Sequence, residues 1–322
     1  MLSQCTLQHQ TQNSISLGAD LIWKHVQLHS PVEQQLSSRP VLASLTSCRV
    51  RCTKLPSNSA SDGPGVVHSS ESSATGVRIA SWNVNGLRST PSQYLEKVLR
   101  RTDVLLLQET KLPSDNPVYD FFKWNDSTVG CAASQSGRAG VIITSRNKPR
   151  SVLLNPIPIG GPGRSILTSF DAFSVLNLYF PHGHRDHRNL SEKINFAEAT
   201  IEFVQRWAGP PLVLGGDFNI AHHDIDVCRY KSNRKSILFL PELREYFDIL
   251  LEMGYVDSVR SLNENRSGVY SWWPYAFGAR DRNVGWRIDY ILVPDGISVE
   301  QAGHLTRIYG SDHCPVYANI IP

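Results

Sequence analysis

The chain has 322 residues, of which 41% are hydrophobic and 19% are charged, and its formal net charge is +3. This is the composition of an ordinary globular protein with one large domain or two small ones, and it excludes a histone-like basic protein. No apolar run reaches the length of a transmembrane helix, so we expect no membrane contact. The six cysteines show no paired spacing, which indicates reduced thiols rather than a disulfide framework.

Residues 1–76 are rich in Ser and Gln and end in a Ser/Gly cluster, a composition typical of a disordered N-terminal extension or linker. The scarcity of acids, with only Asp20 and Glu33 in the first part, also fits an organelle transit peptide. Against that, the arginine density is low and no amphipathic basic helix is evident. A transit peptide, a disordered tail and a start codon assigned too far upstream all remain open.

From Val77 onward, short β-branched runs bounded by Gly, Pro, Asp or Asn predict strands at 77–82, 104–107, 140–144, 166–170, 173–179, 212–214, 288–293 and 316–321. Longer stretches between them predict helices at 92–101, 190–207 and 242–253. Buried and half-exposed strands with interleaved helices indicate an α/β or α+β domain, which we expect to cover residues 77–322.

Polar residues stand where four of these strands end or begin: Asn83 and Asn85, Glu109, Asp217 and Asn219, and the pair Asp312-His313. Each motif alone has a simpler explanation, as a turn, a helix cap, a solvated strand end or a surface loop. All of them occupy the same kind of position, however, and strand ends on one side of a sheet are where α/β folds build sites. We therefore expect them to meet in one pocket.

Asp289 lies in an apolar run from Ile288 to Val293, so it should be buried and should need a partner. His313 is the natural partner, because an Asp–His pair raises the basicity of the imidazole and fixes its tautomer. The carboxylates and amides form an oxygen-rich set that suits Mg²⁺ or Mn²⁺ rather than zinc. Such a metal withdraws charge from phosphate oxygens while a base prepares water, which favours phosphate-ester hydrolysis.

Six ordered blocks closely resemble the exonuclease III family of apurinic/apyrimidinic (AP) endonucleases, within the endonuclease/exonuclease/phosphatase superfamily. They are SWNVNGLR (81–88), LLLQETK (105–111), LNLYFP (176–181), GGDFNIAHHDID (215–226), GWRIDY (285–290) and GSDHCP (310–315). The resemblance implies a deoxyribonuclease-I-like four-layer sandwich, in which two mixed β-sheets pack face to face, helices flank them, and the active site lies at one rim.

The resemblance also implies a role for each matching residue. Glu109 would be the principal metal ligand, with Asn83, Asn85 and Asp312 in or near its shell. Asp217 would orient or deprotonate the attacking water, and Asn219 would position it. The remaining catalytic roles fall to His313, held by Asp289 and binding the scissile phosphate, and to Tyr179, which would donate to the phosphate or stabilise the leaving oxygen.

The aromatic segment between Tyr270 and Trp286 would wall a pocket for a flipped, baseless deoxyribose. Residues expected to contact the substrate, besides Asn85, are Arg185, Trp272, Arg280, Trp286 and Ile288. Ala276 is too small to wedge into a DNA groove, so Arg185 or Phe277 is a candidate for that task. A basic segment after the GDFN block would reach the DNA backbone, or else would be solvated surface: Arg229, Lys231, Arg234 and Lys235.

We therefore expect a Mg²⁺-dependent (or Mn²⁺-dependent) nuclease that cleaves the phosphodiester 5′ to an abasic site and also processes 3′ ends. Its partner would be double-stranded DNA with abasic sites or blocked 3′ ends, and it would act as a monomer. A 3′-end-processing exonuclease, another phosphoesterase of the superfamily and an inactive nucleic-acid-binding module are the alternatives. In a eukaryote we expect it in the nucleus or mitochondrion, and otherwise in the cytoplasm.

Overall fold

The computed structural model describes residues 76–113, 122, 127–133, 137–183 and 189–322. The N-terminal extension expected over residues 1–76 lies outside this part of the chain except for Gly76, and Arg185 also lies outside it. Within the described ranges, no helix is both long and apolar enough to cross a membrane. Of the cysteines in these ranges, Cys131 and Cys314 are buried and Cys228 is partly exposed.

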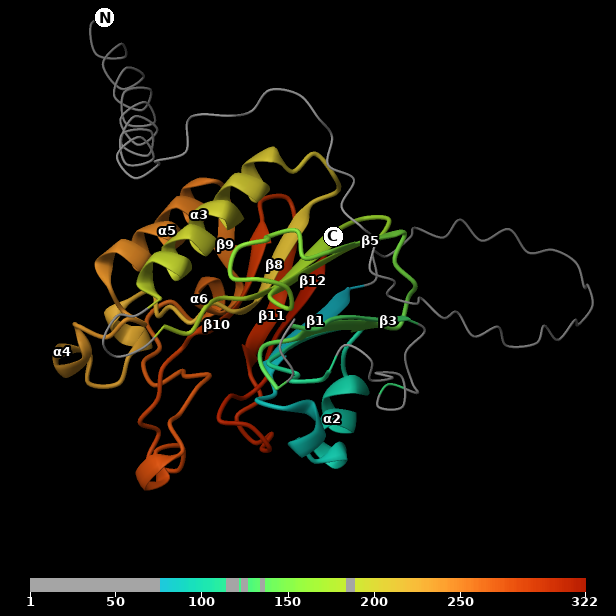
Figure 1. Ribbon diagram of the computed structural model, residues 1–322. Helices are drawn as coiled ribbons and strands as arrows, with labels where there is room; N and C mark the ends of the chain where they lie inside the picture. Colours follow the sequence, from blue (N-terminus) through green and yellow to red (C-terminus); the bar gives the residue numbers. More distant parts are fainter. Residues whose placement is uncertain (1–75, 114–121, 123–126, 134–136, 184–188) are drawn as a thin grey trace, which may run out of the picture. The chain divides into compact units, whose positions relative to one another are not determined.

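The described strands form two mixed sheets of six strands each (Figure 1). The first sheet has the order β11-β12-β1-β2-β4-β3, and β1 runs parallel to β2 but antiparallel to β12. Its strands are β1 (Val77–Asn83), β2 (Val104–Gln108), β3 (Ser127–Cys131), β4 (Val141–Ser145), β11 (Ser298–His304) and β12 (Val316–Ile321).

The second sheet has the order β5-β6-β7-β8-β10-β9. Here β7 runs parallel to β8, and β10 runs antiparallel to β8. Its strands are β5 (Ser151–Leu154), β6 (Ser165–Ser169), β7 (Ser174–Tyr179), β8 (Leu212–Asp217), β9 (Tyr255–Asp257) and β10 (Asp289–Pro294).

Helices cover the outer faces of the two sheets, with α2 on the first sheet and α3 and α5 side by side on the second (Figure 1). The buried residues of α3 recur at the spacing of one helical face: Lys193, Phe196, Ala197, Thr200, Ile201 and Val204. The α-helices are α2 (Ser92–Leu99), α3 (Leu190–Arg206), α4 (Tyr230–Asn233), α5 (Pro241–Glu252) and α6 (Ser258–Leu262).

The central strands are buried on both faces, which explains their continuous apolar runs. Leu106 of β2 and Val213 of β8 lie in the core between the sheets. Their chain neighbours Leu107 and Leu214 point the other way, Leu107 into the core beneath α2 and Leu214 into the core beneath α3 and α5. The predicted four-layer sandwich is confirmed.

Candidate active site

The polar residues at the strand ends meet at one rim of the sandwich. Because β1 and β2 are parallel, Asn83 and the turn that carries Glu109 leave the first sheet at the same edge. Strand β8 of the second sheet ends at Asp217. The Asn83 Nδ2 atom donates to Glu109 Oε1 at 2.9 Å and to Asp217 Oδ2 at 2.9 Å. One buried amide therefore joins the carboxylates of the two sheets.

Asp217 is held by the backbone around it. Gly216 has a φ of 147°, and a Cβ at this position would lie 1.9 Å from the Leu178 carbonyl oxygen of the neighbouring strand. Only glycine permits that approach, so Gly216 fixes where Asp217 leaves the sheet. The Oδ1 atom of Asp217 accepts from the backbone N of Asn219 at 2.9 Å, and Oδ2 accepts from Asn219 Nδ2 at 3.1 Å.

The electrostatic environment of Asp217 suits a proton acceptor. Burial raises the pKa of the Asp217 carboxyl, and the neighbouring Asp289 carboxylate raises it further. The charge of His313 and the hydrogen bond from Asn83 act in the opposite direction. A general base works best when its pKa lies near the working pH, and this balance moves Asp217 toward that range.

His313 and Asp289 form the pair that the sequence predicts. His313 Nδ1 lies 2.9 Å from Asp289 Oδ2, and both side chains are buried. Burial alone would lower the pKa of His313, but Asp289, with Asp217 and Asp312 nearby, raises it to about 10. The imidazole is therefore cationic near neutral pH and can stabilise negative charge. Ligand atoms of Asp217, Asp289 and His313 lie within 4.8 Å of one another.

Glu109 lies at the more open side of the same rim. Burial would raise the pKa of Glu109, but the hydrogen bond from Asn83 and the charges of His313 and Lys111 lower it, so the group is ionised. Lys111 Nζ lies 3.3 Å from Glu109 Oε2 and also donates to Asn85 Oδ1. The Tyr179 hydroxyl donates to Glu109, and burial with the charge of Glu109 raises the pKa of this phenol, which keeps its proton.

Asp312 joins this group from the loop before β12. Its Oδ1 atom accepts from Asn85 Nδ2 at 3.0 Å, and its Oδ2 atom accepts from the Trp272 indole at 3.0 Å. Trp272 also lies next to His313, with 6.4 Å between ring centroids. The structure thus brings together the expected catalytic residues, and it links Glu109 to Asn85 through Lys111 and Asn85 to Asp312.

The orientation of Asn83 differs from the expectation that it would be a metal ligand. Its Oδ1 atom accepts from the backbone N of Asn85 at 3.0 Å, while its nitrogen faces the two carboxylates. An amide nitrogen is a donor and does not ligate a hard cation. Asn83 therefore holds Glu109 and Asp217 in place, and the oxygen ligands left for a cation are those of Glu109, Asn85 and Asp312.

The expected sugar pocket is reproduced only in part. Trp272 and Trp286 lie on adjacent segments, paired through their backbones at 2.9 Å, and Trp286 is 9% exposed. Ile288 is 1% exposed, and both Ile288 and Trp286 belong to the core that packs against α3 and α5. The Ile288 side chain offers almost no surface to a ligand, because it lies one residue before β10 and faces inward. Of these three side chains, Trp272 is partly exposed, whereas Trp286 and Ile288 are buried.

Arg280 also has a different role from the expected DNA contact. Its guanidinium donates to the backbone carbonyls of Ser311 at 2.9 Å, Ile308 at 2.6 Å and Thr306 at 3.1 Å. It also stacks on the rings of Trp273 and Tyr309. A guanidinium engaged in this way braces the loop that carries Asp312 and His313.

A buried ion network lies behind the site. Arg287 is fully buried and donates to Asp226 at 2.8 and 2.9 Å and to Asp257 at 2.6 Å. Arg260 donates to Asp226 from α6. Since Arg287 lies one residue after Trp286, this network anchors the GWRIDY segment to the GDFN loop and to α6.

Two lysines contribute to the site that the sequence analysis did not single out. Lys111 contacts Glu109 and Asn85. Its position two residues after the glutamate is the sequence feature that could have revealed it. Lys193 of α3 is fully buried and donates to the carbonyl of Asn219. The sequence feature that could have revealed Lys193 is a lysine on the apolar face of a predicted helix. A buried lysine there needs a polar partner to offset the cost of its burial.

The fold and this rim of carboxylates, amides and a charged histidine define a hydrolase built on a two-sheet α/β sandwich. A family model described as the endonuclease/exonuclease/phosphatase family matches residues 80–313. The chain belongs to this family.

Similar proteins agree with the motifs. An exodeoxyribonuclease of Bacillus subtilis is 35% identical over 261 residues, which cover 74% of this chain and 98% of that protein. A DNA-(apurinic or apyrimidinic site) endonuclease of Dictyostelium discoideum is 36% identical over 254 residues, covering 74% of this chain and 69% of that protein. An AP endonuclease structure from Archaeoglobus fulgidus matches with a TM-score of 0.68 at 28% identity, over 75% of this chain and 98% of that one.

Proposed function

We propose that this protein is a Mg²⁺-dependent DNA repair nuclease that hydrolyses the phosphodiester 5′ to an abasic site and also removes blocking groups or nucleotides from 3′ ends. The observation that carries the proposal is the convergence of Asp217, the Asp289–His313 pair and Glu109 at one rim. The names of the exodeoxyribonuclease and AP endonuclease relatives support the choice of DNA as substrate.

The roles follow from charge and hydrogen bonding. Asp217 accepts a proton from the attacking water, and Asn219 holds that carboxylate through its backbone N and its amide nitrogen. His313, kept cationic by Asp289, neutralises charge that develops on the phosphate in the transition state. Tyr179 keeps its proton, which it donates to Glu109 in the free protein and would turn to a phosphate or leaving oxygen bound beside Glu109.

The donor set at Glu109 fits a hard divalent cation. Glu109 is ionised, its carboxylate is 20% exposed, and Asn85 and Asp312 add further oxygens. The ammonium of Lys111 already rests against Glu109 and Asn85, which marks a place where positive charge is stabilised. The trio of Asp217, Asp289 and His313 fits less well, because a histidine must be neutral to ligate. A bound Mg²⁺ would withdraw charge from the phosphate.

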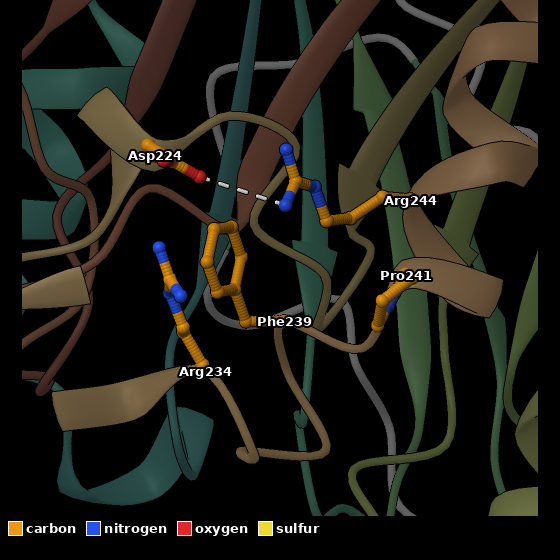
Figure 2. A pocket seen from close by; sticks show the side chains of 5 residues that line it. All are labelled: Asp224, Arg234, Phe239, Pro241 and Arg244. Carbon is orange, nitrogen blue, oxygen red and sulfur yellow. Dashed lines mark ion pairs between the residues drawn. The ribbon is translucent and has the colours of Figure 1, made fainter. Parts of the chain in front are cut away.

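The surface next to the site supports a DNA backbone contact. The side chains of Arg229, Lys231, Arg234 and Lys235 are all exposed on and around α4. Figure 2 shows Arg234 and Arg244 on either side of Phe239, with Arg244 paired to Asp224 at 3.6 Å. Arg244 also donates to the carbonyl of His222, so it is tied to the protein. Arg234 remains exposed for a phosphate.

Incubation with three duplexes tests the proposal, one with an abasic analogue, one with a 3′-phosphate and one with an undamaged recessed end. With Mg²⁺ we expect incision 5′ to the abasic analogue, and EDTA should abolish it. An Asp217→Asn variant is the control for a contaminating nuclease. A wild-type protein that acts only on the two 3′-end substrates would refute the AP endonuclease assignment.

That outcome would favour a second candidate, a 3′-end-processing exonuclease. The burial of Ile288 and the small side chain of Ala276 favour it, because both reduce the surface available to grip an extruded sugar. The relative named exodeoxyribonuclease is consistent with this alternative.

A further inference from the structure

His182 lies on the loop that follows β7, directly beside the catalytic amide of Asn219. Its Nδ1 atom is 3.0 Å from Asn219 Oδ1. The other end of the same amide, Nδ2, donates to Asp217 Oδ2 at 3.1 Å and to the Phe180 carbonyl at 3.1 Å. A carboxylate and a carbonyl can only accept there, so the nitrogen must face them and the oxygen must face His182. His182 Nδ1 is therefore the protonated, donating atom.

The main chain of Asn219 is held by other groups. Its N donates to Asp217 Oδ1 at 2.9 Å, and its carbonyl accepts from the buried ammonium of Lys193. The residue has a φ of 51°, in the left-handed region that asparagine tolerates. The backbone position is thus fixed without His182, and what His182 adds is control of the side-chain amide.

That control matters because the terminal torsion of asparagine is broad and roughly two-fold. If the amide turned over, Oδ1 would face the Asp217 carboxylate, acceptor against acceptor, and the Nδ2 donor would point away from the site. A donor at residue 182 favours the productive orientation, since it hydrogen-bonds to Oδ1 only when Nδ2 faces Asp217.

We propose that His182 is a positioning residue of the nuclease reaction, acting by fixing the Asn219 amide so that its nitrogen faces and holds the Asp217 carboxylate. The inference rests on the proposed function, because it gives Asn219 a place in the hydrolytic step. His182 itself touches no reacting atom in this scheme.

Two substitutions separate the orienting role of His182 from a role that depends only on the bulk of its side chain. His182→Asn places an amide nitrogen at the same number of bonds from Cα as Nδ1, so it keeps a donor toward Asn219. His182→Leu keeps bulk and removes the donor. Because His182 is exposed, neither change should disturb folding. Thermal unfolding of both variants checks that expectation.

The assay is single-turnover incision of a duplex with an abasic analogue, measured across DNA concentrations in Mg²⁺. His182→Leu should lower the maximal rate roughly 10- to 100-fold, the usual range for losing a group that orients an active-site residue, with little change in half-saturation. His182→Asn should keep most of the wild-type maximal rate. In an Asn219→Ala background, His182→Leu should have no further effect, because the amide it orients is gone.

The outcomes that would overturn the inference are distinct from failure of the proposed function. A weaker half-saturation with an unchanged maximal rate would mean that His182 contacts DNA directly. Equal losses in the Leu and Asn variants, additive losses with Asn219→Ala, or no loss at all would each exclude the orienting role. If the wild-type protein does not incise the abasic duplex, the proposed function itself fails.

Discussion

Replacing Arg287 with methionine should destabilise the domain strongly, although Arg287 makes no contact with the proposed reaction centre. The guanidinium is fully buried and makes three hydrogen bonds to carboxylate oxygens of Asp226 and Asp257. Methionine fills much of the space but leaves Asp257 Oδ2 without its partner, while Asp226 keeps Arg260 and the backbone N of His223. Removing one member of a buried ion pair costs about 3–5 kcal/mol, which corresponds to roughly 6–20 °C in Tm for a domain of this size.

The effect should depend on pH with a definite sign. Burial alone would raise the pKa of Asp226, but Arg287 and then Arg260 hold it far below its usual range. A carboxyl whose folded-state pKa is depressed stabilises the protein fully above its unfolded pKa of about 3.9, and that contribution is lost as the pH falls below this value. The difference in unfolding free energy between wild type and Arg287→Met should therefore be largest near neutral pH and shrink in acid.

Urea unfolding at about pH 7 and about pH 3.5, followed by circular dichroism, measures both effects. Arg282→Met is the matched control, since Arg282 is exposed and lies five residues away; it should change stability by no more than about 0.5 kcal/mol. The reasoning would be refuted if Arg287→Met proved as stable as this control, or if its deficit were the same at both pH values.

The remaining predictions concern chemistry and selectivity. Glu109→Gln should sharply reduce incision and weaken its dependence on Mg²⁺, because a hard cation prefers a charged oxygen; an unchanged Mg²⁺ titration would exclude Glu109 as the ligand. His313→Asn should lower turnover roughly 10²-fold or more with little change in DNA affinity, since the cation acts on the transition state, and a parallel loss of binding would indicate a structural role. Trp286→Ala should lower abasic-site incision relative to nicking of undamaged DNA; an unchanged ratio, in protein shown to be folded, would assign Trp286 to the core.

The sequence alone determined the interior of the fold. All eight predicted strands are present within a few residues of their expected bounds, because strands buried on both faces are continuous apolar runs. The four strands that were missed, β3, β5, β9 and β11, are the edge strands of the two sheets. An edge strand is partly solvated and is defined by its pairing partner, so its own residues carry a weak pattern: β5 is largely exposed, and no residue of β11 is fully buried.

In the candidate active site, too, the sequence revealed some features and the tertiary structure decided the others. Glu109, Asp217, Asp289 and His313 were identifiable because charged residues at the ends of apolar strands have few purely structural explanations. The tertiary structure decided what each of these groups contacts. The Asn83 nitrogen faces two carboxylates, and Arg280 donates to the backbone of a loop. The side chain of Ile288 is buried in the core.

The physical reason is that hydrogen bonds depend on atomic distances and directions between segments far apart in the chain. Asn83 and Asp217 are separated by 134 residues, and His182 and Asn219 by 37, yet each pair meets within 3.0 Å. Residue type and strand position reveal which groups need a partner. Only the packing of the two sheets determines which partner is within reach.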